Sequence, residues 1–257
     1  RIYDRAVIWD LGVYFSLNRS KVLVLSEDKD IFGGELDNTI LKDQLNLMRV
    51  GEPMYVFYGY VEDGYDENGH IVYKNMDDDP AITAADKTII GDPNPDFLVN
   101  LTTAVSYKGF TLSAFFQSSI GNDIYSLSMA AQAYDYGYNG NTLREVYYNH
   151  WTPENPTAKY PNLDQTSYKM SDRFVYDGSF VRLKNLELAY DVPCARSKFI
   201  KRARVYVSAQ NLFTITSYPF WDPDINANGG GSSMIQGVDS YCYPSARTYT
   251  IGCRLTF

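Results

Sequence analysis

Cysteine, histidine and catalytic motifs are scarce in this sequence. The 3 cysteines, Cys194, Cys242 and Cys253, are odd in number and widely spaced, which fits neither a disulfide framework nor a zinc site. The 2 histidines, His70 and His150, have no motif partner, and no Gly-x-Ser-x-Gly or phosphate-loop motif is present. The sequence therefore gives no indication of an enzyme, although two glycosidase carboxylates paired only by folding would leave no spacing signal.

Basic charge and long apolar runs are also missing. Because 23 Lys and Arg stand against 31 Asp and Glu, the net charge is −8 and nucleic acid is not an expected partner. No apolar run reaches the roughly 18 residues of a transmembrane helix, but strands that cross a bilayer alternate and escape this test. The chain starts at Arg1 without a methionine or a signal peptide, so we expect a processed or truncated product.

Alternation of apolar and polar residues is the strongest pattern in the chain. The 23 tyrosines and the aromatic content of 15% also favour strands and interfaces. We predict strands over 7–20, 96–107, 110–118, 180–190, 204–213 and 247–257. These runs are close to the roughly 9–11 residues with which a tilted strand crosses a bilayer. A loss of phase near 182–185 predicts a β-bulge.

The connections between these runs are alternately short and long. Lys108-Gly109 and 192–202 are short, whereas 120–176 and 214–246 are long and rich in Tyr, Trp, Asn, Gly and Pro. This is typical of an outer-membrane barrel, with short periplasmic turns and long outer loops. A soluble β-sandwich that binds glycans is the alternative, since its strands alternate too. Aromatic residues at the strand ends, and polar residues on the opposite faces, favour the barrel.

Local signals predict further structure inside the long connections. The Thr142–Glu145 spacing is that of a capping box and predicts a short helix that ends near Asn149. A second helix is predicted over 124–134. The dipeptide Asn68-Gly69 predicts a hairpin turn.

Six strings in order carry a resemblance to a known family. They are "TIIGDPNPDF", "SYKGFTLSAFFQSSIGNDIY", "WTPENPTAKYP", "YDGSFVRLKNLELAYDVP", "ARVYVSAQNLFTITSYPFWDPD" and "YPSARTYTIGCRLTF". With them the chain resembles the C-terminal part of the SusC/RagA-type TonB-dependent outer-membrane transporters of Bacteroidetes-like bacteria, most firmly over 50–257. The fold class this implies is all-β, an antiparallel transmembrane barrel segment with long, partly helical outer loops.

The resemblance implies a larger molecule than residues 1–257. Such a transporter is a barrel of about 22 strands around a plug. This chain would be its C-terminal portion, without the N-terminal plug domain. The other strands must come from elsewhere, because open sheet edges are not viable in lipid. The implied function is import of oligosaccharides or peptides, with a SusD-like surface lipoprotein outside and TonB acting through the plug. It involves no bond chemistry and requires no cofactor.

The resemblance also implies roles for the strands. Tyr249, Ile251, Leu255 and Phe257 are similar to the C-terminal signal that the barrel-assembly machinery reads. The residues expected to face membrane lipid are Val99, Leu101, Leu188, Val205, Val207 and Ile251.

An acidic stretch over 75–86 has the spacing of a calcium loop. The predicted ligands are Asn75, Asp77, Asp79, Ala81 (through its carbonyl), Thr83 and Asp86. Pro80 stands where such loops have glycine, and Asp86 is shorter than the usual glutamate. A solvated acidic loop without bound Ca²⁺ is therefore the alternative.

Aromatic residues with nearby carboxylates in the long loops suit stacking against a polar ligand. The predicted substrate-binding residues are Tyr147, Tyr148, Trp151, Tyr218, Trp221, Asp222 and Asp224. The alternative is that these side chains pack the loops onto one another.

Overall fold

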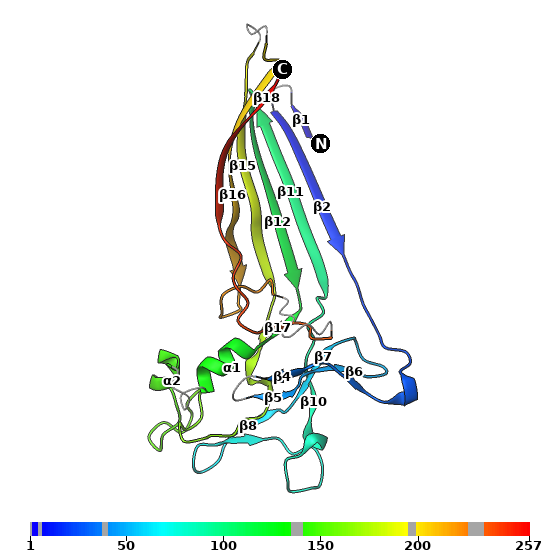
Figure 1. Ribbon diagram of the computed structural model, residues 1–257, viewed down its shortest axis with the longest axis vertical. Coiled ribbons are helices and arrows are strands. Elements are labelled where there is room, and N and C mark those ends of the chain that lie inside the picture. The colour runs from blue at the N-terminus through cyan, green and yellow to red at the C-terminus, as the bar shows by residue number, and fades with distance from the viewer. Residues whose placement is uncertain (1, 5–6, 38–40, 135–140, 195–198, 226–233) are drawn as a thin grey trace.

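The computed structural model describes residues 2–4, 7–37, 41–134, 141–194, 199–225 and 234–257. One long sheet stands upright in Figure 1, and a layer of loops, short strands and helices gathers at one of its ends. The sheet has the order β1-β2-β11-β12-β15-β16-β18, and every neighbouring pair is antiparallel. Its strands are β1 (Ile2–Asp4), β2 (Val7–Ser16), β11 (Phe97–Tyr107), β12 (Phe110–Ile120), β15 (Phe180–Val192), β16 (Arg202–Thr216) and β18 (Thr248–Thr256).

The strand predictions are confirmed with shifted ends, except in one place. Residues 17–20 are not strand, because the pairing of β2 with β11 ends at Ser16 and Leu98 and leaves the next residues without a partner strand. Lys108 and Gly109, with φ of 47° and 85°, make the tight turn between β11 and β12.

The predicted bulge is also confirmed. Register shifts occur between Leu183 and Asn185 and, on β12, between Phe115 and Phe116. Opposite the first shift, Asn211 adopts a φ of 51°, a left-handed conformation that Asn tolerates better than most residues. Relative to β12, Lys184 is the extra residue of β15, and it keeps Leu183 on the same face as Leu186 and Leu188.

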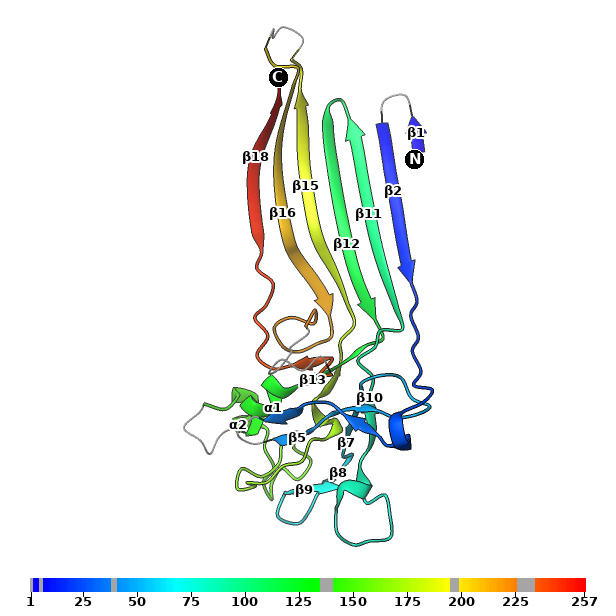
Figure 2. The same cartoon turned by 45° about the vertical axis from the view of Figure 1, so that its right-hand side comes forward.

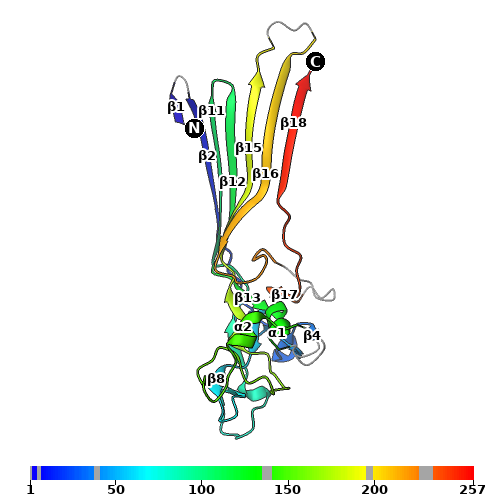
Figure 3. The ribbon, with the colours of Figure 1, turned by 90° about the vertical axis from the view of Figure 1, so that its left-hand side faces the viewer.

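The register places side chains of one kind in rows across the sheet. One apolar row is Trp9, Val105, Leu112, Leu188, Val207 and Ile251. Every member of this row is at least 37% exposed. The opposite face carries polar rows, of which one is Tyr14, Asn100, Gln117, Arg182 and Thr214, and another is Asp10, Ala104, Ser113, Glu187, Ser208 and Thr250. Figure 3 shows the sheet from the side, where no second sheet of described residues covers the apolar face.

The layer at the end of the sheet, which we call the loop layer, has its own small sheets. One has the order β10-β7-β6-β3 and another β14-β13-β17, and β4-β5 and β8-β9 are hairpins. The strands are β3 (Ile31–Phe32), β4 (Glu35–Asp37), β5 (Lys42–Gln44), β6 (Asn46–Met48), β7 (Val56–Gly59), β8 (Glu62–Tyr65), β9 (Ile71–Tyr73), β10 (Thr88–Gly91), β13 (Asp123–Ser126), β14 (Val175–Asp177) and β17 (Val238–Asp239). The helices are α1 (Leu127–Tyr134) and α2 (Arg144–Tyr148), with short 3-10 turns at Ser26–Asp28, Ala84–Asp86 and Asp172–Phe174.

The buried apolar core of the described residues lies in the loop layer. Leu45, Phe57 and Tyr125 are fully buried there, and the cluster extends from Leu36 to Val238. None of its described members belongs to the seven strands of the long sheet. The loop layer is therefore a packed body, which Figure 2 shows below the long strands.

The two predicted helices exist but begin differently. The helix predicted over 124–134 starts only at Leu127, because the preceding residues pair as strand β13 with β14 and β17. Helix α2 ends at Tyr148, one residue before the predicted Asn149. It has no capping box, since the Thr142 hydroxyl donates to the Gln132 carbonyl instead (2.9 Å). The hairpin around Gly69 (φ 79°) is confirmed between β8 and β9. No helix in the described residues combines the length and the hydropathy needed to cross a membrane.

Candidate functional site at the junction of sheet and loops

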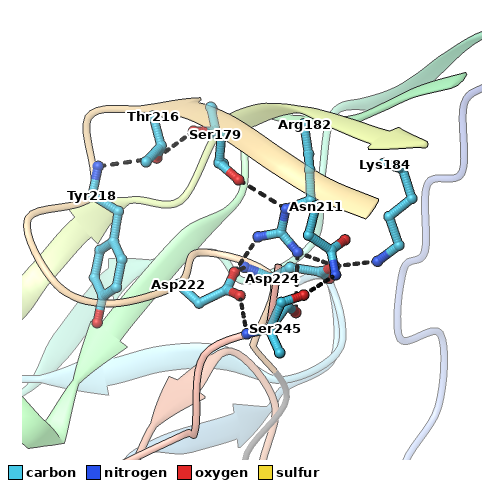
Figure 4. A network of polar contacts seen from close by, with 11 residues as sticks. Ser179, Arg182, Lys184, Asn211, Thr216, Tyr218, Asp222, Asp224 and Ser245 are labelled. Carbon is cyan, nitrogen blue, oxygen red and sulfur yellow. Dashed lines mark hydrogen bonds and ion pairs between the residues drawn. The ribbon is translucent and has the colours of Figure 1, made fainter. Parts of the chain in front are cut away.

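A buried arginine links the polar face of the sheet to the long loop after β16. Arg182 is 1% exposed, and Figure 4 shows its guanidinium pointing toward Asp222, Asp224 and Ser245. Its Nε donates to Thr214 Oγ1 (2.9 Å), Nη1 donates to Asp224 Oδ2 and Ser245 Oγ (3.3 Å each), and Nη2 pairs with Asp222. Arginine suits this position because its fork of donors satisfies several acceptors at once.

The Asp222 carboxylate is satisfied from three sides. Besides Arg182, it accepts the backbone N–H groups of Asp224 and Ser245, each at 2.9 Å. Burial alone would raise the pKa of Asp222, but these N–H donors and the guanidinium outweigh it and lower the pKa. The cluster therefore holds the segments around 222–224 and 245 against the polar face of β15.

Beside this cluster are two hollows of about 430 and 440 Å³, of which the first lies against the polar face of the sheet and the second is lined only by residues outside the long strands. They share the lining residues Pro93, Pro95, Asn122, Pro223 and Ile225, so we treat them as one space and call it the trough. The sheet contributes its floor, with Leu98, Asn100, Phe115, Gln117, Ser119 and Phe180. Each hollow lies within the roughly 300–1,000 Å³ of small-ligand sites.

Hydrogen bonds from asparagine side chains hold the wall of the trough that the loop layer forms. Asn46, which is 1% exposed, donates through Nδ2 to the carbonyls of Tyr55 (2.8 Å) and Gln236 (3.0 Å). Asn94 Nδ2 donates to the Met54 carbonyl at 2.8 Å. Tyr55 lines the trough in a left-handed conformation with a φ of 66°, which is strained for an aromatic residue.

The structure separates the residues predicted to bind substrate into two groups. Tyr218 is buried, and its hydroxyl donates to Asp239 Oδ2 (2.6 Å) and contacts Ser126 Oγ (2.8 Å). Burial, followed by the hydrogen bond to Asp239, raises its pKa far above the ordinary value. Tyr218 and Asp222 thus make internal contacts that stabilise the loop layer, and their contact with substrate stays a prediction.

The other predicted residues are more accessible. Tyr147 and Tyr148 are 61% and 69% exposed on α2, with their rings edge to face at 5.1 Å. Trp221 is 57% exposed and stacks on Phe220, with ring centroids 4.7 Å apart. Trp151 is half-buried against the Gly69 turn. None of these side chains lines the hollow that Asp224 lines, and their role stays a prediction.

Of the residues that line the trough, sequence reasoning selects Asp224 and misses the others. The sequence analysis mentions the region of Arg182 only as the place of a β-bulge. An arginine on the polar side of a strand, together with an acidic loop elsewhere in the chain, could have indicated an ion pair between them. Asn100 and Gln117 have the right parity for the polar face, but their pairing depends on the register. Asn46 carries no local signal at all, because its partners lie in segments distant in sequence.

The predicted calcium loop forms a series of short turns. Backbone N–H groups of Asp77, Asp79 and Ala81 donate to the side-chain oxygens of residues 75, 77 and 79. Asp86 is buried and accepts the N–H groups of Met76 and Thr83 at 2.7 Å, which lowers its pKa. Among the residues described, no group of three or more His, Cys, Asp or Glu side chains could hold a metal ion. Calcium binding over 75–86 stays a prediction.

The membrane-facing and terminal predictions lie on the apolar face. Val99 and Leu101 are partly exposed, whereas Leu188, Val205, Val207 and Ile251 are 45–84% exposed. Tyr249, Leu255 and Phe257 are also exposed. Both sets have the parity of the apolar rows, and β18 is at the edge of the sheet.

Comparison with known proteins gives consistent relatives, although no family model matches the sequence. The TonB-dependent receptor P3 of Formosa agariphila is 32% identical over 277 residues, covering 100% of this chain and 27% of that receptor. The TonB-dependent receptor SusC of Bacteroides thetaiotaomicron is 28% identical, covering 100% of this chain and 25% of SusC. A solved structure of the RagAB peptide transporter matches the whole chain with a TM-score of 0.81 and 24% identity, over 28% of its own length.

The chain thus spans about a quarter of the length of these relatives. Its fold and its similarity over the whole length define a class, namely a segment of a TonB-dependent receptor. Within that class the chain is a segment of the SusC/RagA type.

Proposed function

We propose that this chain forms the C-terminal strands and outer loops of a TonB-dependent outer-membrane importer. The observation that carries this proposal is the contrast between the two faces of the sheet. One face exposes whole rows of Val, Leu and Ile, and the other carries rows of Asn, Gln, Arg, Glu and Thr. Lipid solvates the first kind of surface, and a water-filled lumen solvates the second.

The open edges of the sheet support a longer protein. β1 and β18 end the sheet within the described residues, and unpaired N–H and C=O groups are costly in lipid. The remaining strands, most simply from the same polypeptide, then close the barrel around an N-terminal plug. In this arrangement Phe257 and the short turns lie on the periplasmic side, and the loop layer lies outside.

The partners follow from the relatives. SusC and the RagAB transporter support pairing with a SusD-like surface lipoprotein and energy supply through TonB. We extend this to the barrel-assembly machinery, which would read Tyr249, Ile251, Leu255 and Phe257. The imported nutrient is an oligosaccharide or a peptide, bound without bond chemistry and without a required cofactor. The sandwich alternative has no support, because the apolar face is not a water-free core.

The test is the size and location of the native polypeptide. An antibody against the 141–176 segment is used on a blot of outer-membrane and aqueous fractions. A band several times heavier than 29.2 kDa that only detergent extracts is the expected result. A band near 29.2 kDa in the aqueous fraction would contradict the proposal.

A further inference from the structure

We propose that Arg19 and Lys21 bind the phosphate of a lipid headgroup at the outer rim of the apolar face. This inference rests on the proposed function, because it needs lipid against that face and the loop layer on the outer side. It adds an anion-binding site at the membrane surface, which the alternation of the strands does not assign. We call the two side chains the rim pair.

The rim pair follows the last aromatic residues of the apolar face. Phe15 of β2 and Phe97 of β11 stack at this end of the sheet, with ring centroids 5.8 Å apart. Aromatic residues are typical of the levels at which a barrel meets lipid headgroups. After Ser16 the chain leaves the sheet, and Figure 2 shows it running toward the loop layer. Arg19 and Lys21 lie on this segment, which places them at headgroup level in the proposed orientation.

Both cations are accessible and line one hollow. Arg19 and Lys21 are exposed, and they share a hollow of about 640 Å³ with Ser16, Asn18 and Phe97 among its other lining residues. Within the part of the chain that the structure describes, neither the guanidinium nor the ammonium has a hydrogen bond or an ion pair. A guanidinium fork and an ammonium together offer several charged donors to the oxygens of one phosphate. The rim pair is therefore available for an anion.

The two carboxylates that also line the hollow are directed elsewhere. Asp92 Oδ1 accepts the backbone N–H (2.9 Å) and the Nδ2 group (2.7 Å) of Asn94. The Asp96 carboxylate lies against Gly121, which follows β12, and β12 is on the far side of β11 from β2. Neither carboxylate forms an ion pair with the rim pair, so the positive charge there is not neutralised by the described residues.

The apolar neighbours of the rim pair favour a lipid over a dissolved anion. Leu17 precedes the pair, Leu23 and Val24 follow it, and each of the three is more than half exposed. Such side chains gain free energy from contact with acyl chains, while the long stems of arginine and lysine reach from an apolar surface to the headgroups. A dissolved phosphate ion would leave the three apolar side chains in water. A lipid satisfies both parts of the segment, with its phosphate on the cations and its chains on the apolar residues.

The experiment uses the full-length receptor with its partner lipoprotein, purified in a mild detergent. Native mass spectrometry measures binding of dioleoyl phosphatidic acid and of dioleoylglycerol, which is the same lipid without the phosphate. The test variant is Arg19→Gln with Lys21→Gln. The control is Lys29→Gln with Lys159→Gln, which removes the same charge from exposed lysines that already pair with glutamates at 2.6 and 2.9 Å.

A second variant, Arg19→Lys with Lys21→Arg, keeps both charges and tests whether charge is what the site needs. Far-UV circular dichroism and outer-membrane abundance check that each variant folds. We expect the glutamine variant to bind phosphatidic acid about tenfold more weakly, because each basic residue at a membrane surface adds to the affinity for anionic lipid. The control and the charge-keeping variant should stay within about twofold of the unmodified receptor, and binding of dioleoylglycerol should not change.

Three results would overturn the proposal. Equal binding of phosphatidic acid to the glutamine variant and to the control would show that the rim pair holds no lipid. Inorganic phosphate that competes as well as phosphatidic acid would show a site for a free ion. Loss of the lipoprotein from the glutamine variant, with lipid binding unchanged, would show that the cations contact protein. Each of these leaves the import function in place, whereas a receptor found in the aqueous fraction would remove both proposals.

Discussion

The long sheet and the loop layer place their apolar residues in opposite ways. In the sheet, Ile251 is 84% and Val207 49% exposed, whereas Leu45 and Phe57 of the loop layer are fully buried. The sheet is a single layer whose apolar face no other described segment covers, while the loop layer folds several short strands and helices around a core. The same residue types thus occur in two environments. In our proposal lipid covers the apolar face of the long sheet, whereas other side chains of the protein cover the apolar residues of the loop layer.

The two regions meet at the Arg182 cluster, so breaking it is expected to have the largest effect. Arg182→Met leaves Asp222 buried without its counter-ion, which costs about 3–5 kcal/mol in the free energy of unfolding. The measurement is urea unfolding of the full-length receptor in lipid vesicles, with protease sensitivity of the 214–225 segment as a local readout. Lys184→Met, whose ammonium lies 3.9 Å from Asp224 at a partly exposed site, should cost only about 0–1 kcal/mol. Equal losses in both variants would show that the cluster does not connect the two regions.

A charge on the apolar face is expected to have the next largest effect. Val207→Arg places a guanidinium in the exposed apolar row, between Leu188 and Ile251, and should cost about 2–4 kcal/mol if lipid covers it. Ser208→Arg is the matched control, because the next residue along β16 faces the polar side. Folded yield in the outer membrane and unfolding in vesicles measure the difference. If Val207→Arg is tolerated as well as Ser208→Arg, water rather than lipid covers this face.

The sequence is sufficient for six of the seven strands of the long sheet, because their signals are local, and it misses only the short β1. Alternation locates six strands, and the loss of phase near Arg182 locates the bulge, since a period of two directly reports which face a residue occupies. The loop layer has no such period. Its strands have only two to four residues, and they pair across long separations, as when Tyr125 of β13 meets Val238 of β17.

The candidate site could be predicted even less. The trough combines residues from near positions 55, 94, 120, 180, 224 and 236, and only folding brings these segments together. The loop aromatics resemble binding residues, but a sequence does not separate a buried Tyr218 from an exposed Trp221. Burial and hydrogen-bond partners make that distinction.

A smaller effect tests packing within the loop layer. At Gly69 (φ 79°) a methyl group would overlap the Trp151 ring, whereas at Gly64 (φ 97°) it would meet open space. Both alanine variants carry the backbone cost of about 1–2 kcal/mol for a left-handed residue, so the extra loss in Gly69→Ala measures the ring contact. Thermal unfolding followed by tryptophan fluorescence compares the two. Identical melting curves would mean that Trp151 does not pack on this turn.

Mild acid is expected to have the smallest effect, because it changes the charge of one side chain, Asp222, at the junction of the two regions. The folded pKa of Asp222 is lowered, so its contribution to stability is fully present above the ordinary carboxyl pKa of about 4. Below that pH the unfolded state takes up the proton first, and the contribution is lost as pH falls through the lowered pKa of the folded state. Hydrogen exchange at the Asp224 and Ser245 amides, which donate to this carboxylate, should accelerate over that range after correction for intrinsic rates.

The amides of Val207 and Ile251 are the control, because the side chains in their row bear no titratable group and their exchange should stay unchanged. Acceleration of both pairs together would mean that acid opens the whole molecule rather than the junction.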